Sequence, residues 1–476
     1  MSTLTLAWLA LPFVVGFIGY MLPKLDRYLS LGVAIASCGY ALLLFVEPPL
    51  TLQLLDSFGV TLLVDRLSGF FILTNALVTA AVILYCWRSD KTAFFYMQTI
   101  ILHGSVNAAF ACADFISLYV ALEVISIAAF LLIAYPRTNR SIWIGLRYLF
   151  TSNVAMLFYL VGAALVYKAS HSFAFTGLRA APPEALALIF LGLLVKGGIF
   201  VSGLWLPLTH SESEAPVSAM LSGVVVKAGV LPLVRCALLV QEVDPLIRIF
   251  GVGTALLGVG YAVFEKDTKR MLAFHTVSQL GFILAAPEVG GFYALTHGLV
   301  KSALFLIAGV LPSRNLKELQ HQPIHTPIWI ALVMASFSIS GFPLLSGFGA
   351  KVLTLNSLLP WQVIGMNVAA LGTAIVFAKF IFLPHQKDEQ ADVQPGFWAA
   401  IILLICGLIL ANVVYYEAYT VANIVKPLVT IALGWLAYFL IFRRTVLKLP
   451  RLLEQFDHLI GMMSLVLILL FWMVLA

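Results

Sequence analysis

Ionisable side chains lie inside the apolar segments of this sequence. Glu123 occurs in LYVALEVISIAAFLLIAY, Lys196 in LLVKGGIFVSGLWLP and Lys227 in SGVVVKAGVLPLVR. A charged group near the centre of a bilayer costs about 3 kcal/mol on insertion scales, so ionisable residues in such segments are functional candidates by default. The sequence therefore presents one carboxylate and two lysines that suit proton or ion chemistry inside a membrane.

Glu123 and Lys196 are predicted to form a pair. A glutamate at mid-membrane depth has to be protonated, paired with a cation or in contact with water. Lys196 follows the run EALALIFLGLLV, which places it roughly 15 Å of helix beyond the preceding loop, too far for its own side chain to span. The structural alternative is a protonated Glu123 bonded to a neighbouring helix. Lys227 has a similar structural alternative.

Two histidines share helix faces with other polar residues. His297 and Lys301 are spaced i, i+4 in LTHGLVKSALF, and His275 and Gln279 have the same spacing in AFHTVSQLGF. A histidine inside a helix bundle either hydrogen-bonds structurally or relays protons. Both interpretations stand for His275, whereas the lysine one turn away favours a relay for His297.

Two predicted spans are interrupted by glycine and proline, one around Lys196 and one around Lys351 in SISGFPLLSGFGAK. Such residues free backbone groups that lipid cannot satisfy, so the breaks belong where protein or water lines a cavity, and paired breaks point to a transport path. The residues that form the breaks are Gly197, Gly198, Pro207, Gly341, Pro343 and Gly347.

The ionisable residues fall on six predicted spans at similar depth, so they are expected to form a row in the membrane plane. Burial favours the neutral form of a lysine, which can then both accept and release protons. Lys379 and Lys426 are interpreted as structural and Arg235 as an anchor at a helix end. The predicted proton relay consists of Glu123, Lys196, Lys227, His275, His297, Lys301 and Lys351.

The composition predicts the class of protein to which this row of residues belongs. The chain has 476 residues, of which 62% are apolar and 11% charged, and its mean hydropathy is +1.02. These values predict an all-α polytopic membrane protein with about 14–16 transmembrane helices and no appended soluble domain. The first apolar segment lacks a basic start and a clear cleavage site, so we expect it to be an uncleaved span. Apolar stretches of spanning length lie near 4–22, 28–46, 67–87, 92–112, 115–135, 142–167, 186–206, 216–240, 246–264, 270–287, 291–311, 327–359, 361–383, 397–415, 420–442 and 458–476.

Loop charges predict the orientation. Of the 28 Lys and Arg residues, sixteen fall in odd-numbered loops and four in even-numbered loops, and the other eight lie inside or at the ends of spans. Basic loops face the cytoplasm, so both termini are predicted to be non-cytoplasmic. The membrane is expected to be a bacterial inner or plasma membrane, or a thylakoid.

Several kinds of chemistry lack their usual sequence signals. The five cysteines are scattered singly, with no CxxC and no histidine at zinc-ligand spacing. No GxGxxG follows a strand, so we expect no cofactor, no metal and no redox site of the chain's own. The net charge of +6 fits basic cytoplasmic loops and does not call for nucleic acid. A stand-alone permease for a small solute remains an alternative, although aligned titratable groups suit protons better.

Taken together, these motifs resemble a known family: the proton-translocating, antiporter-like membrane subunits shared by respiratory complex I and Mrp-type multisubunit cation/proton antiporters. The resemblance rests on YVALEVIS, VKGGIF, GLWLPLTHSESEAPVSAM, VVVKAG, DTKRMLAFHTVSQLGF, HGLVKSALFLIAG and SGFPLLSGFGAK. It departs from the family at AFHTVSQ, where a serine pair is usual, and at Glu214, a second acid beside the expected Glu212. The first departure puts the route past His275 in doubt.

The resemblance implies an arrangement and matches the residues of the relay. Glu123, Lys196, Lys227, His297, Lys301 and Lys351 correspond to the family's charged positions, with broken seventh and twelfth helices. Two inverted five-helix repeats are implied. The expected division is 1–112 for the N-terminal helices and the start of the first repeat, 92–240 and 246–384 for the repeats, and 397–476 for the C-terminal helices.

Lysine at position 351 favours the D-type membrane component of an Mrp antiporter. The expected function is therefore that of the proton-conducting subunit of a multisubunit Na⁺/H⁺ antiporter, with other membrane subunits as partners and with protons and Na⁺ as the transported ions. The alternative is a proton-pumping membrane subunit of complex I or of a photosynthetic NAD(P)H/ferredoxin–quinone oxidoreductase. In that case it would be part of a translocase whose redox centres belong to partner subunits.

Overall fold

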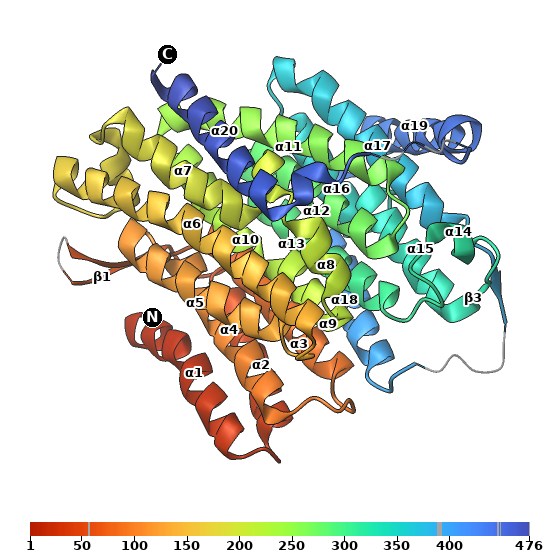
Figure 1. Ribbon diagram of the computed structural model, residues 1–476, viewed down its shortest axis with the longest axis horizontal. Helices are drawn as coiled ribbons and strands as arrows, with labels where there is room; N and C mark the ends of the chain where they lie inside the picture. The colour runs from red at the N-terminus through yellow and green to blue at the C-terminus, as the bar shows by residue number, and fades with distance from the viewer. Residues whose placement is uncertain (56–57, 388–392, 445–446, 448, 476) are drawn as a thin grey trace.

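The computed structural model describes residues 1–55, 58–387, 393–444, 447 and 449–475. Helices account for most of this part of the chain (Figure 1), as the sequence predicts. Two small sheets complete it: β1 (Leu50–Leu55) pairs antiparallel with β2 (Gly59–Val64), and β3 (Ile324–His325) pairs parallel with β4 (His385–Gln386). Two residues of the expected loops and C-terminal segment, Lys448 and Ala476, lie outside the described residues.

Eleven helical segments in the described part are long and apolar enough to cross a membrane, and a bent pair brings the number to twelve. The single helices among them are α1 (Ser2–Met21), α3 (Arg66–Tyr85), α5 (Phe115–Ile133), α6 (Asn139–Ser170), α11 (Asp244–Phe264), α13 (Gly290–Ala308), α17 (Val363–Ile381), α18 (Phe397–Val414), α19 (Val421–Ala437) and α20 (Phe456–Leu475). The eleventh segment joins α9 (Ala215–Met220), the π-helical turn η4 (Leu221–Val225) and α10 (Lys227–Leu239). The bent pair consists of α7 (Pro183–Gly197), η3 (Phe200–Gly203) and α8 (Leu206–Glu212).

The other spans that hydropathy predicts correspond to helices that are shorter or more polar. Internal histidines and charged or amide side chains lower the apolar character of several of them, and the twelfth expected span is divided into two short helices. These helices are α2 (Asp26–Leu43), α4 (Ala93–Ala111), α12 (Thr268–Ala285), α15 (Thr326–Ser340) and α16 (Ser346–Asn356), and a one-turn helix, α14 (Leu316–Leu319), lies in a loop.

Short polar side chains fix where several helices begin. Asp65 accepts a hydrogen bond from the backbone N–H of Ser68, and Asp114 accepts one from that of Ser117. Asp267 does the same for Arg270 at the start of α12. A capping side chain of this kind satisfies an N–H that the first helical turn leaves unpaired.

The centre of the molecule is formed by α12, α13 and the α9–η4–α10 segment. Every residue of α12 and α13 is buried, although both helices carry ionisable side chains. Glycines let the neighbouring α11 approach α12 closely, since a Cβ at Gly258 would lie 2.3 Å from the backbone nitrogen of Ser278. These central helices therefore carry four buried residues of the predicted relay, namely Lys227, His275, His297 and Lys301.

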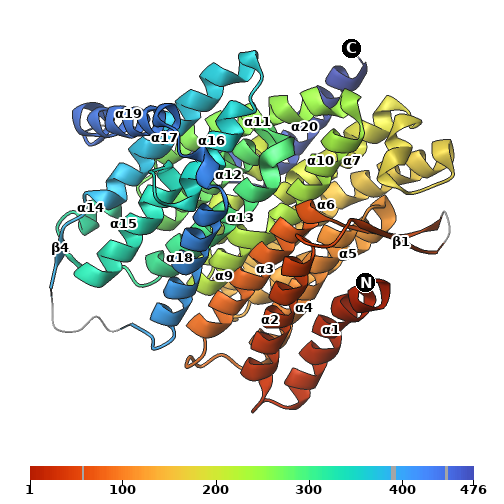
Figure 2. The ribbon, with the colours of Figure 1, turned by 180° about the vertical axis from the view of Figure 1, so that it is seen from behind.

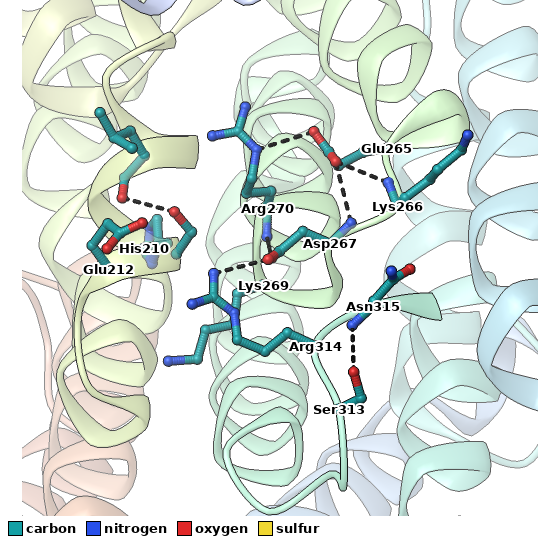
Figure 3. Close-up of polar contacts among 12 residues, drawn as sticks. His210, Glu212, Glu265, Lys266, Asp267, Lys269, Arg270, Ser313, Arg314 and Asn315 are labelled. Atoms are coloured by element: carbon teal, nitrogen blue, oxygen red, sulfur yellow. Dashed lines mark hydrogen bonds and ion pairs between the residues drawn. The ribbon is translucent and has the colours of Figure 1, made fainter. Parts of the chain in front are cut away.

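Connections between the helices gather at two faces. On one face Lys91 pairs with Glu214, and Arg314 pairs with Asp267 (Figure 3). These residues belong to odd-numbered connections, which carry most of the basic residues, and we call this side the basic-loop face. The even-numbered connections meet at the opposite face, where Arg235 pairs with Asp65.

The last helix does not pack beside the one before it. Helix α19 lies against α17 at one end of the molecule, whereas α20 lies against α7 at the other, as both views show (Figures 1 and 2). The intervening chain is attached to the basic-loop face: Arg270 pairs with the Glu454 side chain at 2.5 Å, and Arg147 donates to the Glu454 carbonyl.

Candidate functional site

One end of the predicted relay lies where α5 and α7 meet. Lys196 Nζ donates to the carbonyl oxygen of Leu122 at 3.0 Å and also contacts the hydroxyl of Ser126. The nearest carboxylate oxygen of Glu123 is 3.9 Å away. The Glu123 side chain is 25% exposed against 4% for Lys196, so the acid lies at the edge of the bundle and the lysine lies inside it.

A backbone break directly follows Lys196. Helix α7 ends at Gly197, and Gly198 adopts a left-handed conformation with φ of 66°, where an added Cβ would lie 2.2 Å from the side chain of Leu206. Phe200 also has positive φ, at 53°. The indole of Trp205 donates to the carbonyl of Val195 at 2.9 Å, and that carbonyl also accepts from the backbone N–H of Gly198 at 3.1 Å.

The second group of the relay is built on the π-helical turn η4. Lys227 Nζ donates to the carbonyl oxygens of Gly223 at 2.6 Å and Ser222 at 3.2 Å, and it lies 3.1 Å from Nδ1 of His297. A π turn leaves carbonyls without their usual helical partner and is often found at functional sites. Among the described residues no carboxylate pairs with Lys227, so neutral oxygens and a histidine surround its amine.

Lys301 lies one turn along α13 from His297. Its Nζ donates to the carbonyl of Leu272 on α12 at 2.8 Å and lies 5.7 Å from the ring centre of Phe377. The edge of the His275 ring meets the same phenylalanine, with ring centres 4.8 Å apart. Lys301 and His275 thus both lie close to the ring of Phe377.

His275 and Gln279 converge on a threonine of α17. His275 Nε2 lies 3.1 Å from the hydroxyl of Thr373, and the amide nitrogen of Gln279 lies 3.4 Å from it. The hydroxyl of Tyr293 donates to Gln279 at 2.6 Å. These contacts occupy the place where the sequence departs from the resembled family, and they bring an imidazole and a threonine hydroxyl together there.

Lys351 lies at the far end, beside the second break. Its Nζ donates to the carbonyl of Ser340, the last residue of α15, at 3.2 Å. Gly341 has φ of 84°, and Leu344 has φ of 82° without being a glycine. Lys351 borders a cavity of about 470 Å³ whose polar lining includes Ser340, Asn356, Asn367, Asn423 and Lys426.

The structure buries most of the predicted residues within the helix bundle and brings some of them into contact, but they do not all touch. Direct contacts join Lys196 to the Glu123 segment and Lys227 to His297. Two small cavities of about 10 Å³ border predicted residues, one beside Lys196 and one beside His297. This is about the volume that one water molecule requires. The arrangement suits proton transfer in short steps between bases that are bridged by a hydroxyl group or a water molecule.

Several contributing residues were not predicted. Ser126 is three residues from Glu123 and so shares its helix face, which is a signal that the sequence contains. No signal identifies Thr373, or the contact of 2.7 Å between the hydroxyls of Ser222 and Thr276 that joins the π turn to α12. Lys426, interpreted as structural, lines the Lys351 cavity.

The sequence predicts structural roles for Lys379 and Arg235. Lys379 donates to the carbonyls of Ala262, Val263 and Glu265 and so caps the end of α11. Arg235 contacts both carboxylate oxygens of Asp65 at 2.9 Å, which anchors α10 to the start of α3. Within the described residues, no group of three or more His, Cys, Asp or Glu side chains is placed to hold a metal ion.

Comparisons with known proteins identify the family of the chain. Residues 112–377 match the family described as NADH:quinone oxidoreductase/Mrp antiporter, transmembrane. The D component of the Na⁺/H⁺ antiporter of Alkalihalophilus pseudofirmus is 27% identical over 447 residues, which cover 83% of this chain and 90% of the relative. The N component of the NADH-quinone oxidoreductase of Desulforudis audaxviator is 31% identical over 377 residues, covering 71% and 74%.

Solved structures show the same fold. A chain of the Mrp complex from a Dietzia species has a TM-score of 0.77 at 24% identity, and the match covers 93% of this chain and 56% of that one. A chain of the membrane-bound sulfane sulfur reductase, an archaeal respiratory membrane complex, also has a TM-score of 0.77, at 21% identity, with 92% and 99% covered. The chain therefore belongs to the NADH:quinone oxidoreductase/Mrp antiporter transmembrane family.

Proposed function

We propose that this chain is the proton-conducting membrane subunit of a multisubunit Mrp-type Na⁺/H⁺ antiporter and works together with other membrane subunits. The observation that carries the proposal is the contact of 3.1 Å between Lys227 and His297, two buried bases on separate helices. A proton held by one is within direct reach of the other. The similarity to the D component of a Na⁺/H⁺ antiporter, over 90% of that relative, supports the antiporter assignment.

In this proposal the row carries protons from Glu123 towards Lys351 or in reverse. Glu123 holds the charge on Lys196 while the two are close, and separation favours release of the proton towards Lys227. His297, Lys301 and His275 pass it along α13 and α12. Each of the two ends lies beside a helix break and a more exposed or hollow region.

The backbone breaks support a division into two repeats, 92–240 and 246–384, preceded by the N-terminal helices and followed by 397–476. Each proposed repeat contains one break with a left-handed glycine, Gly198 or Gly341, next to a lysine of the row. Related breaks in two halves are typical of transporters that move ions at the midplane.

We propose that the basic-loop face is cytoplasmic and that both termini lie on the other side of a bacterial inner or plasma membrane, or of a thylakoid. The odd-numbered connections that contact one another there carry sixteen of the 28 Lys and Arg residues. Short loops rich in these residues remain on the cytoplasmic side during insertion.

The relatives support one alternative function. Similarity to the N component of a NADH-quinone oxidoreductase at 31% identity fits a proton-pumping membrane subunit of a complex I-type assembly. In that assembly the same row would move protons, and partner subunits would carry the redox centres. The masses of the subunits that purify with this chain distinguish the two, since iron–sulfur subunits occur only in the second.

The test is proton movement by the purified complex in proteoliposomes. With an imposed Na⁺ gradient, wild type is expected to change the internal pH, and Lys227→Ala is expected to slow this by about 100-fold or more, the usual contribution of a positioned proton-transfer group. Lys379→Gln is the control, because the Lys379 amine is also bonded to backbone carbonyls but is only partly buried and lies outside the row. Equal rates in wild type and an assembled Lys227→Ala complex would refute the relay.

A further inference from the structure

His210 is a buried base that the relay described above does not use. It lies on α8 with none of its surface exposed, and among the described residues neither of its ring nitrogens has a hydrogen-bond partner. The ring stacks on Phe305 with centres 4.8 Å apart and planes 17° apart. A buried polar group without a partner lowers stability, and an apolar ring would stack as well without this cost. The imidazole therefore needs a reason other than packing.

On one side of His210 lies the basic-loop face. The chain continues from it into Ser211–Glu214, where the Glu212 and Glu214 side chains are 28% and 33% exposed. Arg140 pairs with Glu212 at 3.3 Å, and Lys91 pairs with Glu214 at 2.6 Å. Carboxylates that reach solvent thus lie two and four residues from a fully buried imidazole.

A lysine of helix α12 contacts the same loop. Lys269 Nζ donates to the carbonyl of Ser213 at 2.7 Å. Figure 3 shows Lys269 extending from α12 toward the helix that carries His210 and Glu212. The charged groups near His210 are therefore two acids in the loop that follows it and three cations from other elements. Such a cluster of charged groups attracts and exchanges protons at the surface end of the loop.

On the other side of His210 lies the relay. Its stacking partner Phe305 follows Lys301 by one helical turn, about 6 Å along α13. Lys301 donates to Leu272, which is one turn further into the bundle than Lys269 on α12. Along the helix axes, His210 therefore lies between Lys269, the outer lysine on α12, and Lys301, the buried lysine on α13.

We propose that His210 is the proton-transfer residue that connects the buried row to the basic-loop face, between the Glu212–Glu214 loop and Lys301. This inference rests on the proposed function. In the step, one ring nitrogen takes a proton from the loop side and the other gives one up toward Lys301, so the imidazole returns to its neutral form and no electrons move. Stacking on Phe305 fixes the ring plane while both nitrogens stay free at its edge.

The experiment measures proton movement by the reconstituted complex. His210→Phe keeps an aromatic ring for stacking and removes both nitrogens, so we expect assembly like wild type and a rate at least about tenfold lower. His210→Ala leaves space for a small base, and added imidazole is expected to restore a large part of its rate. Imidazole is expected to give no recovery to Lys301→Ala, which shows that rescue is specific to the His210 position.

The outcomes separate this inference from the proposed function. If wild type moves no protons, the proposed function is wrong. If wild type moves protons and an assembled His210→Phe complex moves them at the same rate, His210 is a structural residue and this inference alone is overturned. Should His210→Phe fail to assemble, His210→Gln replaces it, because glutamine offers polar contacts but carries no transferable charge. Wild-type transport by His210→Gln would overturn the inference equally.

Discussion

Neutral oxygen atoms hold the amine of Lys196 in place, and Glu123 is its charged neighbour. Its amine bonds to Leu122 and Ser126, while the Glu123 carboxylate remains 3.9 Å away and partly exposed. A lysine anchored in this way keeps its place whether or not it carries a proton. In the proposed relay, the distance to Glu123 sets how strongly the charge on Lys196 is stabilised, because a movement of a few ångströms changes that interaction substantially in a medium of low polarity.

The first prediction concerns this lysine. Lys196→Arg keeps a cation next to Glu123, but a guanidinium does not release its proton in proteins. We expect the reconstituted complex to assemble normally and to move protons about 100-fold more slowly than wild type. The Lys379→Gln complex is the control for loss of a carbonyl-bonded, partly buried amine outside the row. Transport near the wild-type rate in Lys196→Arg would show that Lys196 only supplies a structural charge.

The second prediction concerns the opposite end of the row. Lys351 borders a cavity of about 470 Å³, so Lys351→Ala enlarges an existing space and creates no new void in a packed core. We expect normal assembly with proton movement abolished, and partial activity in Lys351→Glu, which restores a titratable group. Dye-based rates in proteoliposomes measure both. Unimpaired transport by Lys351→Ala would mean that the row ends elsewhere.

At the scale of single residues, the charged residues can be identified from the sequence, but most residues that contact or position them cannot. An intramembrane charge is rare enough to be noticed by itself, which is why Glu123, Lys196 and Lys351 are predictable. Thr373 resembles any other threonine until the fold brings His275 to it. The sequence does not single out His210, because its apolar stacking and missing partners exist only in three dimensions.

The two broken helices have a common construction. At each break a glycine and a bulkier residue both adopt positive φ: Gly198 with Phe200, and Gly341 with Leu344. A non-glycine residue in this region is strained and persists only where its surroundings hold it. The lysine side chains next to the breaks bond to carbonyls of the helices that adjoin them, so backbone shape and charge position are linked in both elements.

The third prediction tests that link. An added Cβ at Gly341 would lie 2.8 Å from Cδ of Lys351, in a conformation that alanine disfavours. Gly341→Ala is therefore expected to displace the Lys351 side chain and slow proton movement at least about tenfold, even though no ionisable group is lost. The matched control is Gly260→Ala in α11, where nothing lies within 4 Å of the added Cβ. Equal rates in the two variants would show that the break does not position Lys351.

Elements differ in how much of them the sequence predicts. Glycine and proline mark both breaks plainly. The π turn beside Lys227 has no such mark, because a register change of one residue depends on the carbonyls and hydroxyls that surround it. Hydropathy also counts α4 as a span like the others, whereas His103, Asn107 and other polar residues inside it form a buried network with α2 and α3.

At the scale of the whole molecule, charge divides the chain between two faces. The fourth prediction is that a reporter inserted at Lys317, on the basic-loop face, is cytoplasmic, and that one fused after Ala476 is not. The physical reason is that short basic loops resist translocation. A periplasm-specific and a cytoplasm-specific reporter at each position measure this. The reversed pattern would contradict the orientation, while two reporters on the same side would contradict the number of spans.

The fifth prediction concerns how pH changes the stability of the protein through Glu265. Burial raises the pKa of the Glu265 carboxyl, but the charge of Arg270 and hydrogen bonds from the backbone of Lys266 and Asp267 outweigh burial and hold the pKa below its ordinary value. A depressed carboxyl pKa contributes stability above the unfolded value and loses it as the pH falls through the folded one.

Wild type is therefore expected to lose thermal stability as the pH falls from about 5 to below about 4, since an unperturbed glutamate titrates near 4.3. Glu265→Gln, which has no proton to bind there, is expected to lose less over the same range and to be less stable than wild type at pH 7. Melting temperatures of the purified complex measure the difference. Parallel curves for the two proteins would contradict it.

The overall arrangement is only partly predictable. Hydropathy and loop charge predict a helical membrane protein whose basic loops gather on one side, because both depend on local composition. They do not predict that α20 packs on α7, because two apolar helices present similar surfaces to lipid and to each other. That contact depends on Arg270 and Arg147 meeting Glu454, which are far apart in the sequence.

The position of α20 also has a consequence for biosynthesis. The ribosome completes α7, which ends at Gly197, long before it makes α20, which begins at Phe456, yet α20 packs against α7. During translation that surface of α7, next to the break that follows Lys196, faces lipid or an insertion factor. The Lys196 end of α7 is therefore covered only once α20 has been inserted, and a nascent chain truncated after α19 would leave that surface exposed to the bilayer.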